Sequence, residues 1–217
     1  MTKSEIAAPI KNERIRANRA RISPWQQSIE HHAMRLRTEL VLSDLDSLAH
    51  EHALSLIPNC EIWALKNVSR LPYEHVVHFR TEGFKFGAMA FRDADGDLMI
   101  VFNDAHPPAD VRVHLMEEFF HIRLGHLPDA IRLYPQNGKH RTHDYAKEEE
   151  AYGSGIAALV PYGGLEAMLA RGVHIARIAE HFGVPVSVIE HRISVTRLEH
   201  LMSSPQTQLS LLTSTYA

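Results

Sequence analysis

Apolar side chains recur every three or four positions from Pro24 to about Leu40, which is the spacing of an amphipathic helix. Ser23 precedes Pro24, and a serine N-cap followed by proline at the first helical position is a typical helix start. A second amphipathic stretch, with Ser43 as its N-cap, runs to about Leu56. The pattern therefore predicts two helices in the first part of the fold.

Short runs rich in β-branched and aromatic residues come next and are typical of strands. They span residues 61–65, 75–79, 86–91 and 98–102. The segment Asp93–Asp97 separates the last two runs, and its Asp-Gly pair suits the positive φ that a hairpin turn requires. We expect these runs to form a small antiparallel sheet.

After the last strand the apolar pattern returns to helical spacing. It predicts a helix at residues 110–124, with Gly125 as its C-cap, and a second helix at residues 145–160 that Pro161 ends. Two or three shorter helices should follow through about Met202. The order helices, strands, helices predicts an α+β fold.

The 217 residues suffice for one substantial domain with a small helical appendage. We expect four parts along the chain: a basic, flexible arm at 1–22, an α+β domain at 23–161, a helical segment at 162–202 and a flexible tail at 203–217. No run approaches the roughly 20 apolar residues of a membrane-spanning helix. The polar start also lacks a signal-peptide core, so we expect a cytoplasmic protein with no membrane partner.

Composition limits the kinds of site that the chain can form. Cys60 is the single cysteine, which excludes an internal disulfide and a cysteine-based zinc cluster. Any metal must therefore be held by His, Asp or Glu. The net charge of −3 argues against general polyanion binding, although the N-terminal arm is locally basic.

Residues 117–121 read EEFFH, which is the zinc-peptidase signature HExxH with glutamate in place of the first histidine. In HExxH two histidines hold a metal, and the glutamate between them acts as general base on its water. Residues four apart share one helix face, so Glu117 and His121 can reach one ion, and Glu118 is rotated by roughly 100° from Glu117. A third ligand should come from a separate element, for which the acidic run at 148–150 is available.

Other interpretations of the same residues remain open. An EExxH string also suits the solvated acidic edge of an amphipathic helix. A rival ligand set, His114, Glu118 and His121, shares one face at positions i, i+4 and i+7 and would make Glu118 a ligand instead of a base. His126 suits the closing of the helix end, where the helix dipole favours a cation, and His143 suits hydrogen bonds within a loop.

Two segments resemble the metallopeptidase family named for ImmA and IrrE. The first is EEFFHIRLGH at 117–126, and the second is EEEAYGSGIAALVP at 148–161. The family shows an HExxH helix with a leucine-glycine-histidine end and a downstream helix of the form ExEANxFAAxLLMP. The resemblance covers roughly residues 40–195, and it implies a zincin-like pair of active-site helices packed with the small antiparallel sheet.

The resemblance also implies roles for particular residues. The first metal ligand falls on Glu117, the general base on Glu118, the second ligand on His121 and the third on Glu148. The family's asparagine one turn later is Tyr152 in this chain, so the expected partner of the ligand glutamate differs as well.

The donor set of two carboxylates and one imidazole affects the choice of metal. The resemblance implies one divalent ion, which is zinc in the family, and the additional carboxylate shifts the preference toward manganese or iron. Two anionic ligands should also lower the Lewis acidity of the ion, which weakens hydrolysis without necessarily abolishing it. Arg112 matches an arginine often found ahead of the motif in the family, and it suits a structural role.

By resemblance, the function would be cleavage of a protein substrate. The substrate expected from the family is a helix-turn-helix transcriptional repressor, removed by limited cleavage in a stress or mobile-element response. Glu117 and Tyr152 leave a second hypothesis open, in which the protein is a non-catalytic regulator that keeps the fold and a peptide-binding groove without efficient metal chemistry.

Residues 175–192 have the pattern of a helix-turn-helix. Binding to DNA requires a basic, exposed second helix that meets phosphates and base edges. Here Arg192 and Arg197 are balanced by Glu190 and Glu199. The near-neutral charge argues against DNA binding and favours packing or recognition of a protein partner.

Overall fold

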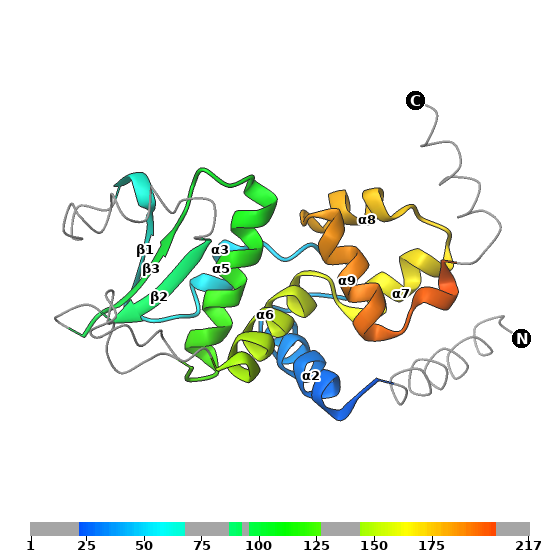
Figure 1. Ribbon diagram of the computed structural model, residues 1–217, viewed down its shortest axis with the longest axis horizontal. Helices are drawn as coiled ribbons and strands as arrows, with labels where there is room; N and C mark the ends of the chain where they lie inside the picture. Colours follow the sequence, from blue (N-terminus) through cyan, green and yellow to red (C-terminus); the bar gives the residue numbers. More distant parts are fainter. Residues whose placement is uncertain (1–21, 68–86, 93–95, 127–143, 203–217) are drawn as a thin grey trace, which may run out of the picture.

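The structure is a computed structural model that describes residues 22–67, 87–92, 96–126 and 144–202. Its elements in chain order are α2 (Pro24–Glu39), α3 (His50–Leu54), β1 (Cys60–Ala64), the 3-10 helix η1 (Leu65–Asn67), β2 (Ala88–Arg92), β3 (Leu98–Phe102), α5 (Pro108–Arg123), α6 (Tyr145–Leu159), α7 (Tyr162–Ala170), α8 (Ile175–Phe182), α9 (Val186–Thr196) and the 3-10 helix η3 (Glu199–Leu201). The sheet lies at one end, α5 and α6 occupy the middle, and α7, α8 and α9 form the other end (Figure 1). The predicted α+β class is confirmed.

Several predicted features lie outside the described residues. They are the strand at 75–79, residue His143, the tail at 203–217 and nearly all of the arm at 1–22. Within the described residues, no helix is both long enough and apolar enough to pass through a membrane.

Three described strands form the sheet, in the order β1-β3-β2. Strands β2 and β3 are antiparallel, with Arg92 opposite Leu98, and Gly96 between them has the positive φ (88°) that the hairpin prediction required. Strand β1 instead runs parallel to β3, with Cys60 opposite Leu98. The prediction of a purely antiparallel sheet is therefore wrong, since the sheet is mixed. The prediction failed because the alternation of apolar and polar residues along a strand shows which face is buried but not in which direction the strand runs.

Helix α2 begins as predicted, because Ser23 Oγ accepts a hydrogen bond from the Gln26 N–H at 3.1 Å. The second predicted helix is wrong over most of its length, since residues 43–49 are not helical. The buried Arg37 side chain explains the difference. Its guanidinium donates to the carbonyls of Ser43 and Asp46, and the Asp46 N–H donates to the Ser43 carbonyl at 3.1 Å, so the segment is held as a turn.

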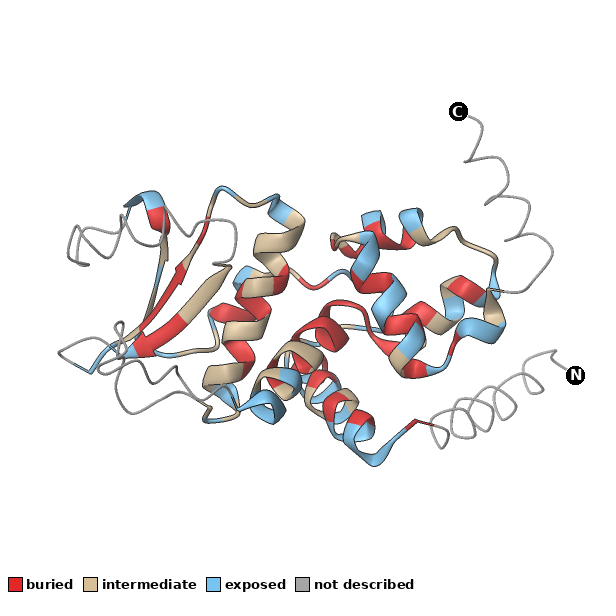
Figure 2. Ribbon diagram, in the orientation of Figure 1, coloured by how far each residue is buried: buried red, intermediate tan, exposed pale blue. Residues whose placement is uncertain are grey.

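One hydrophobic cluster joins α2, α5 and α6 to the C-terminal helices. It includes Ile29 of α2, Phe120 of α5, Ile156 of α6, Phe182 of α8 and Ile189 of α9, all fully or almost fully buried. Figure 2 shows buried residues along the facing sides of these helices. The helices that carry the metal motif and the C-terminal helices therefore share one core.

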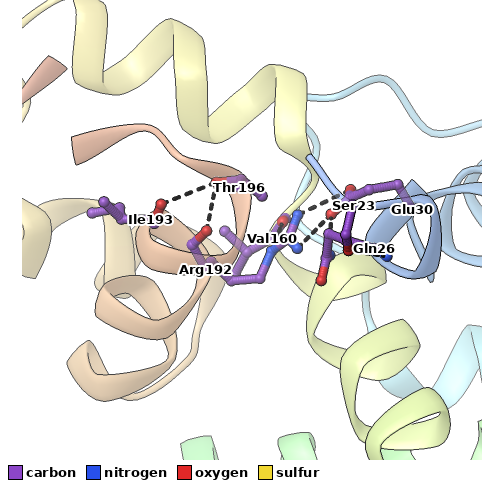
Figure 3. Close-up of polar contacts among 7 residues, drawn as sticks. All are labelled: Ser23, Gln26, Glu30, Val160, Arg192, Ile193 and Thr196. Carbon is purple, nitrogen blue, oxygen red and sulfur yellow. Dashed lines mark hydrogen bonds and ion pairs between the residues drawn. The ribbon is translucent and has the colours of Figure 1, made fainter. Parts of the chain in front are cut away.

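A buried ion pair connects α9 to α2 (Figure 3). The Arg192 guanidinium is fully buried and donates to both carboxylate oxygens of Glu30, at 2.5 and 3.0 Å. Its Nε donates to the Val160 carbonyl at 3.0 Å, and the Gln26 amide donates to Glu30 at 2.8 Å. Arg192, one of the two basic residues considered for DNA contact, is thus directed into the core.

We expect Arg192→Ala to lower the free energy of unfolding by about 3–5 kcal/mol, because it leaves the Glu30 carboxylate without its partner in a nearly dry site. The control is Arg177→Ala, which breaks an exposed pair with Glu180 and should cost about 0.5 kcal/mol or less. Urea denaturation measures both values. Equal losses in the two variants would contradict the importance of the buried pair.

Candidate metal centre

Helix α5 presents the three motif residues beside a buried apolar face. Met116, Phe119 and Phe120 are buried in the core, whereas Glu117 and Glu118 are only partly buried. Burial of the apolar side fixes the rotation of the helix. The motif carboxylates are therefore held at the edge of the core.

A glycine turn ends α5 and positions the next histidine. Gly125 has φ of 71°, its N–H donates to the Ile122 carbonyl at 3.2 Å, and the His126 N–H donates to the His121 carbonyl at 2.8 Å. These two bonds define a Schellman motif, which agrees with the helix end predicted from Gly125. The turn brings the ring centroids of His121 and His126 to 5.6 Å, with the rings 69° apart.

Helix α6 approaches α5 at a glycine. A Cβ on Gly155 would lie 3.0 Å from the carbonyl carbon of Met116 and 3.1 Å from the backbone nitrogen of Glu117. The two helices therefore meet backbone to backbone. Glu148 is seven residues, or about two turns, before Gly155, so it lies on the same side of α6.

The structure brings Glu117, His121 and Glu148 together. Each offers one ligand atom, and these three atoms lie within 4.8 Å of one another. Nε2 of His121 is 3.5 Å from Oε2 of Glu148, and the His121 side chain is only 12% exposed. Ligand bonds of about 2.0–2.2 Å place the donors around one zinc roughly 3–4 Å apart. The donor types and their spacing therefore fit one divalent ion after small side-chain movements.

Glu118 points to the sheet. Its Oε2 accepts a hydrogen bond from the backbone N–H of Ala90, in strand β2, at 2.7 Å. This bond comes from the strand at the edge of the described sheet and fixes the orientation of the carboxylate.

His114 lies beside Glu117, with Nδ1 3.8 Å from Glu117 Oε2. Its ring covers Gly87, where an added Cβ would come within 2.6 Å of the ring, and it packs against the ring of His106. His114 is therefore at the margin of the three converging donors. The rival set proposed from the sequence required Glu118 as a ligand, but among the described residues the donors that converge are Glu117, His121 and Glu148.

Tyr152 lies one turn after Glu148 on α6. Burial, together with the negative charge of Glu117, raises the pKa of the Tyr152 phenol, which therefore remains a hydrogen-bond donor. The ring of His191, from α9, packs against Tyr152 with centroids 6.0 Å apart, and burial lowers the pKa of His191. The C-terminal helices thus extend to the candidate centre.

Glu150 makes polar contacts that the sequence analysis missed. Its Oε2 is 3.2 Å from His126 Nε2, and its Oε1 is 3.3 Å from His32 Nε2. The prediction assigned His126 to the helix end, and it offered the whole acidic run at 148–150 as a source of a ligand before the family resemblance singled out Glu148. Because Glu150 is two residues after Glu148, helical spacing places it on a different face of α6. No pattern in the sequence near Glu150 predicts its contact with His32 on α2.

Arg112 anchors α5 to the segment before α3. Its guanidinium donates to the Leu48 carbonyl and to Ser47 Oγ, and it lies against Gly183 at the end of α8. These contacts agree with the structural role that the sequence indicates.

Comparison with known protein families gives one match. The model of a peptidase family described as the IrrE N-terminal-like domain matches residues 74–194. No curated protein and no solved structure matches the chain. The matched region contains α5, α6 and all three converging donors, and it excludes α2.

We expect Gly155→Ala to weaken both the fold and metal binding, because its Cβ would press on the α5 backbone. Such overpacking typically costs about 1–3 kcal/mol. The control is Gly153→Ala on the same helix, whose Cβ would have side-chain atoms of Ile29 as its nearest neighbours, Cδ1 at 2.8 Å and Cγ2 at 3.3 Å, instead of backbone atoms. Thermal unfolding and metal titration compare the two variants. Equal stability and equal metal affinity would contradict the close helix approach.

Proposed function

The chain belongs to the IrrE N-terminal-like peptidase family, and from that membership we propose that it is a metal-dependent peptidase whose ion is held by Glu117, His121 and Glu148. The convergence of these three donors carries the proposal. They come from two helices inside the matched region, in the order and spacing that the family resemblance implies.

The residues around the donors have distinct proposed roles. A divalent ion bound there supplies Lewis acidity, polarising the scissile carbonyl and lowering the pKa of a water. Glu118 is the proposed general base, whose carboxylate takes the proton of the attacking water and passes it to the leaving amine. The hydrogen bond from the Ala90 N–H orients this carboxylate and connects the proposed base to strand β2.

The choice of ion follows from the chemistry of the donors. Glu117 and Glu148 each bring a negative charge, so the set is harder than two histidines and one carboxylate. Zinc is the ion implied by the resemblance, and manganese or iron also suits this set. Burial and the charge of Glu117 raise the pKa of the Tyr152 phenol, so this side chain stays neutral and adds no further negative charge.

The proposed substrate is a protein. The family resemblance supports a helix-turn-helix transcriptional repressor, removed by limited cleavage in a stress or mobile-element response. Binding of the chain itself to DNA is disfavoured, because the Arg192 guanidinium is engaged by Glu30 in the core.

A second candidate function is a non-catalytic regulator that keeps the fold and binds a protein partner. It is favoured by the glutamate at Glu117, where the signature has histidine, and by Tyr152, where the family has asparagine. Metal analysis separates the two functions, because the regulator requires no stoichiometric ion.

The metal site is tested by Glu148→Gln, which removes one charged donor. Protein purified without chelator should carry about one equivalent of metal, and the variant should lose more than about 100-fold in affinity, since changes behind a ligand already cost about 10- to 100-fold. Elemental analysis and titration with zinc, manganese and iron provide the measurement. Glu149→Gln, an exposed neighbour on the same turn, should retain the ion. A wild-type chain that binds none of these metals would favour the regulator.

Glu118→Gln tests the general base. The substitution keeps size and shape but removes the proton acceptor, so cleavage should slow about 10²- to 10⁴-fold while metal content is unchanged. The rate can be followed by mass spectrometry with a candidate helix-turn-helix repressor and with a mixed peptide library. Glu149→Gln serves again as control. Equal cleavage by wild type and Glu118→Gln would show that the base is misassigned.

A further inference from the structure

Glu150 is a carboxylate shared by two histidines from distant parts of the chain. Oε1 faces Nε2 of His32 on α2, at 3.3 Å, and Oε2 faces Nε2 of His126 at the end of α5, at 3.2 Å. The Glu150 side chain is 22% exposed, and that of His126 is 8% exposed. The three side chains therefore form a largely buried row of polar groups beside the proposed ligands.

The helix geometry explains why Glu150 reaches α2. Gly153, three residues later on the same face of α6, lies directly against Ile29 of α2. Glu148 is rotated by about 200° from Glu150 and faces His121 instead. Within one turn of α6, the Glu148 carboxylate therefore faces the proposed metal site and the Glu150 carboxylate faces α2.

His126 has few ways to fix its own orientation. Its Nδ1 is buried and has no hydrogen-bond partner, and its Nε2 faces Glu150 among the described residues. Its backbone is tied to His121 by the Schellman turn, and its ring packs edge-on against the His121 ring. A rotation of the His126 ring would therefore displace the ring of the proposed ligand.

We propose that His32, Glu150 and His126 are positioning residues that set the ring plane of His121 for metal binding, so that α2 is part of the metal centre. This role rests on the proposed function. His32 lies outside the matched region at 74–194, which makes the contribution of α2 an addition to the family module. A ligand ring is useful only within a narrow range of orientations, which its supporting residues must enforce.

Cobalt(II) alone is a suitable probe, because its visible absorption reports coordination geometry in addition to affinity. Glu150→Gln should weaken cobalt binding about 10- to 100-fold and alter the absorption band, and His32→Ala should do the same to a smaller extent. His31→Ala is the matched control, since His31 is exposed on the same helix; its ring lies 6.4 Å from that of His32, centroid to centroid, but it has no contact with Glu150 among the described residues. Thermal unfolding confirms that each variant is folded at the assay temperature.

Two further variants separate positioning from packing. His126→Phe keeps an edge-on ring and removes the Nε2 contact, so it should resemble Glu150→Gln if that contact sets the orientation. If His32 acts through Glu150, the double variant His32→Ala/Glu150→Gln should bind cobalt no more weakly than Glu150→Gln alone. His32→Gln, which retains a donor, should recover part of the affinity.

The outcomes distinguish this role from the proposed function. Wild-type affinity and absorption in both His32→Ala and Glu150→Gln would overturn the positioning role and leave the metal site intact. Additive losses in the double variant would also overturn it, because they show independent effects. A wild-type chain that binds none of cobalt, zinc, manganese and iron would overturn the proposed function itself, and the positioning role with it.

Discussion

The backbone contact between α5 and α6 at Gly155 is the constraint on which the rest of the structure depends. A side chain at this position would press the two backbones apart, and Glu148 would move away from His121. The sheet packs against α5, whereas α2 and α9 pack against α6. The proposed metal site is therefore a consequence of how closely two helices approach, and the remaining elements hold that approach in place.

Electrostatics around the site compensate for the additional carboxylate. A histidine lies beside Glu117, a protonated phenol lies near the same carboxylate, and Glu150 faces two imidazoles. Glu117 and Glu150 thus each have a neighbour that can reduce repulsion between the carboxylates when no ion is present. These surroundings are compatible with a carboxylate at position 117, where the signature has histidine.

Local signals were sufficient to predict much of the fold. Helices α2, α5 and α6 follow from apolar periodicity, the Ser23 cap, Gly125 and Pro161, all of which act within a few residues of their effect. The same signals failed at 43–49, where the guanidinium of Arg37, six and nine residues earlier on α2, binds the backbone carbonyls of Ser43 and Asp46, and at β1, whose direction depends on a crossover.

The candidate site shows the same division between local and distant information. Glu117 and His121 converge because of helical spacing, and Glu148 was identified only through the family resemblance. The contact of His32 with Glu150 required the packed structure. The ion pair between Glu30 and Arg192 joins a residue outside the family match to a residue inside it. A fragment cut at the limits of the family match would keep the arginine and discard its glutamate, which leaves a buried guanidinium without a counter-charge. The contacts that stabilise α9 therefore extend beyond residues 74–194.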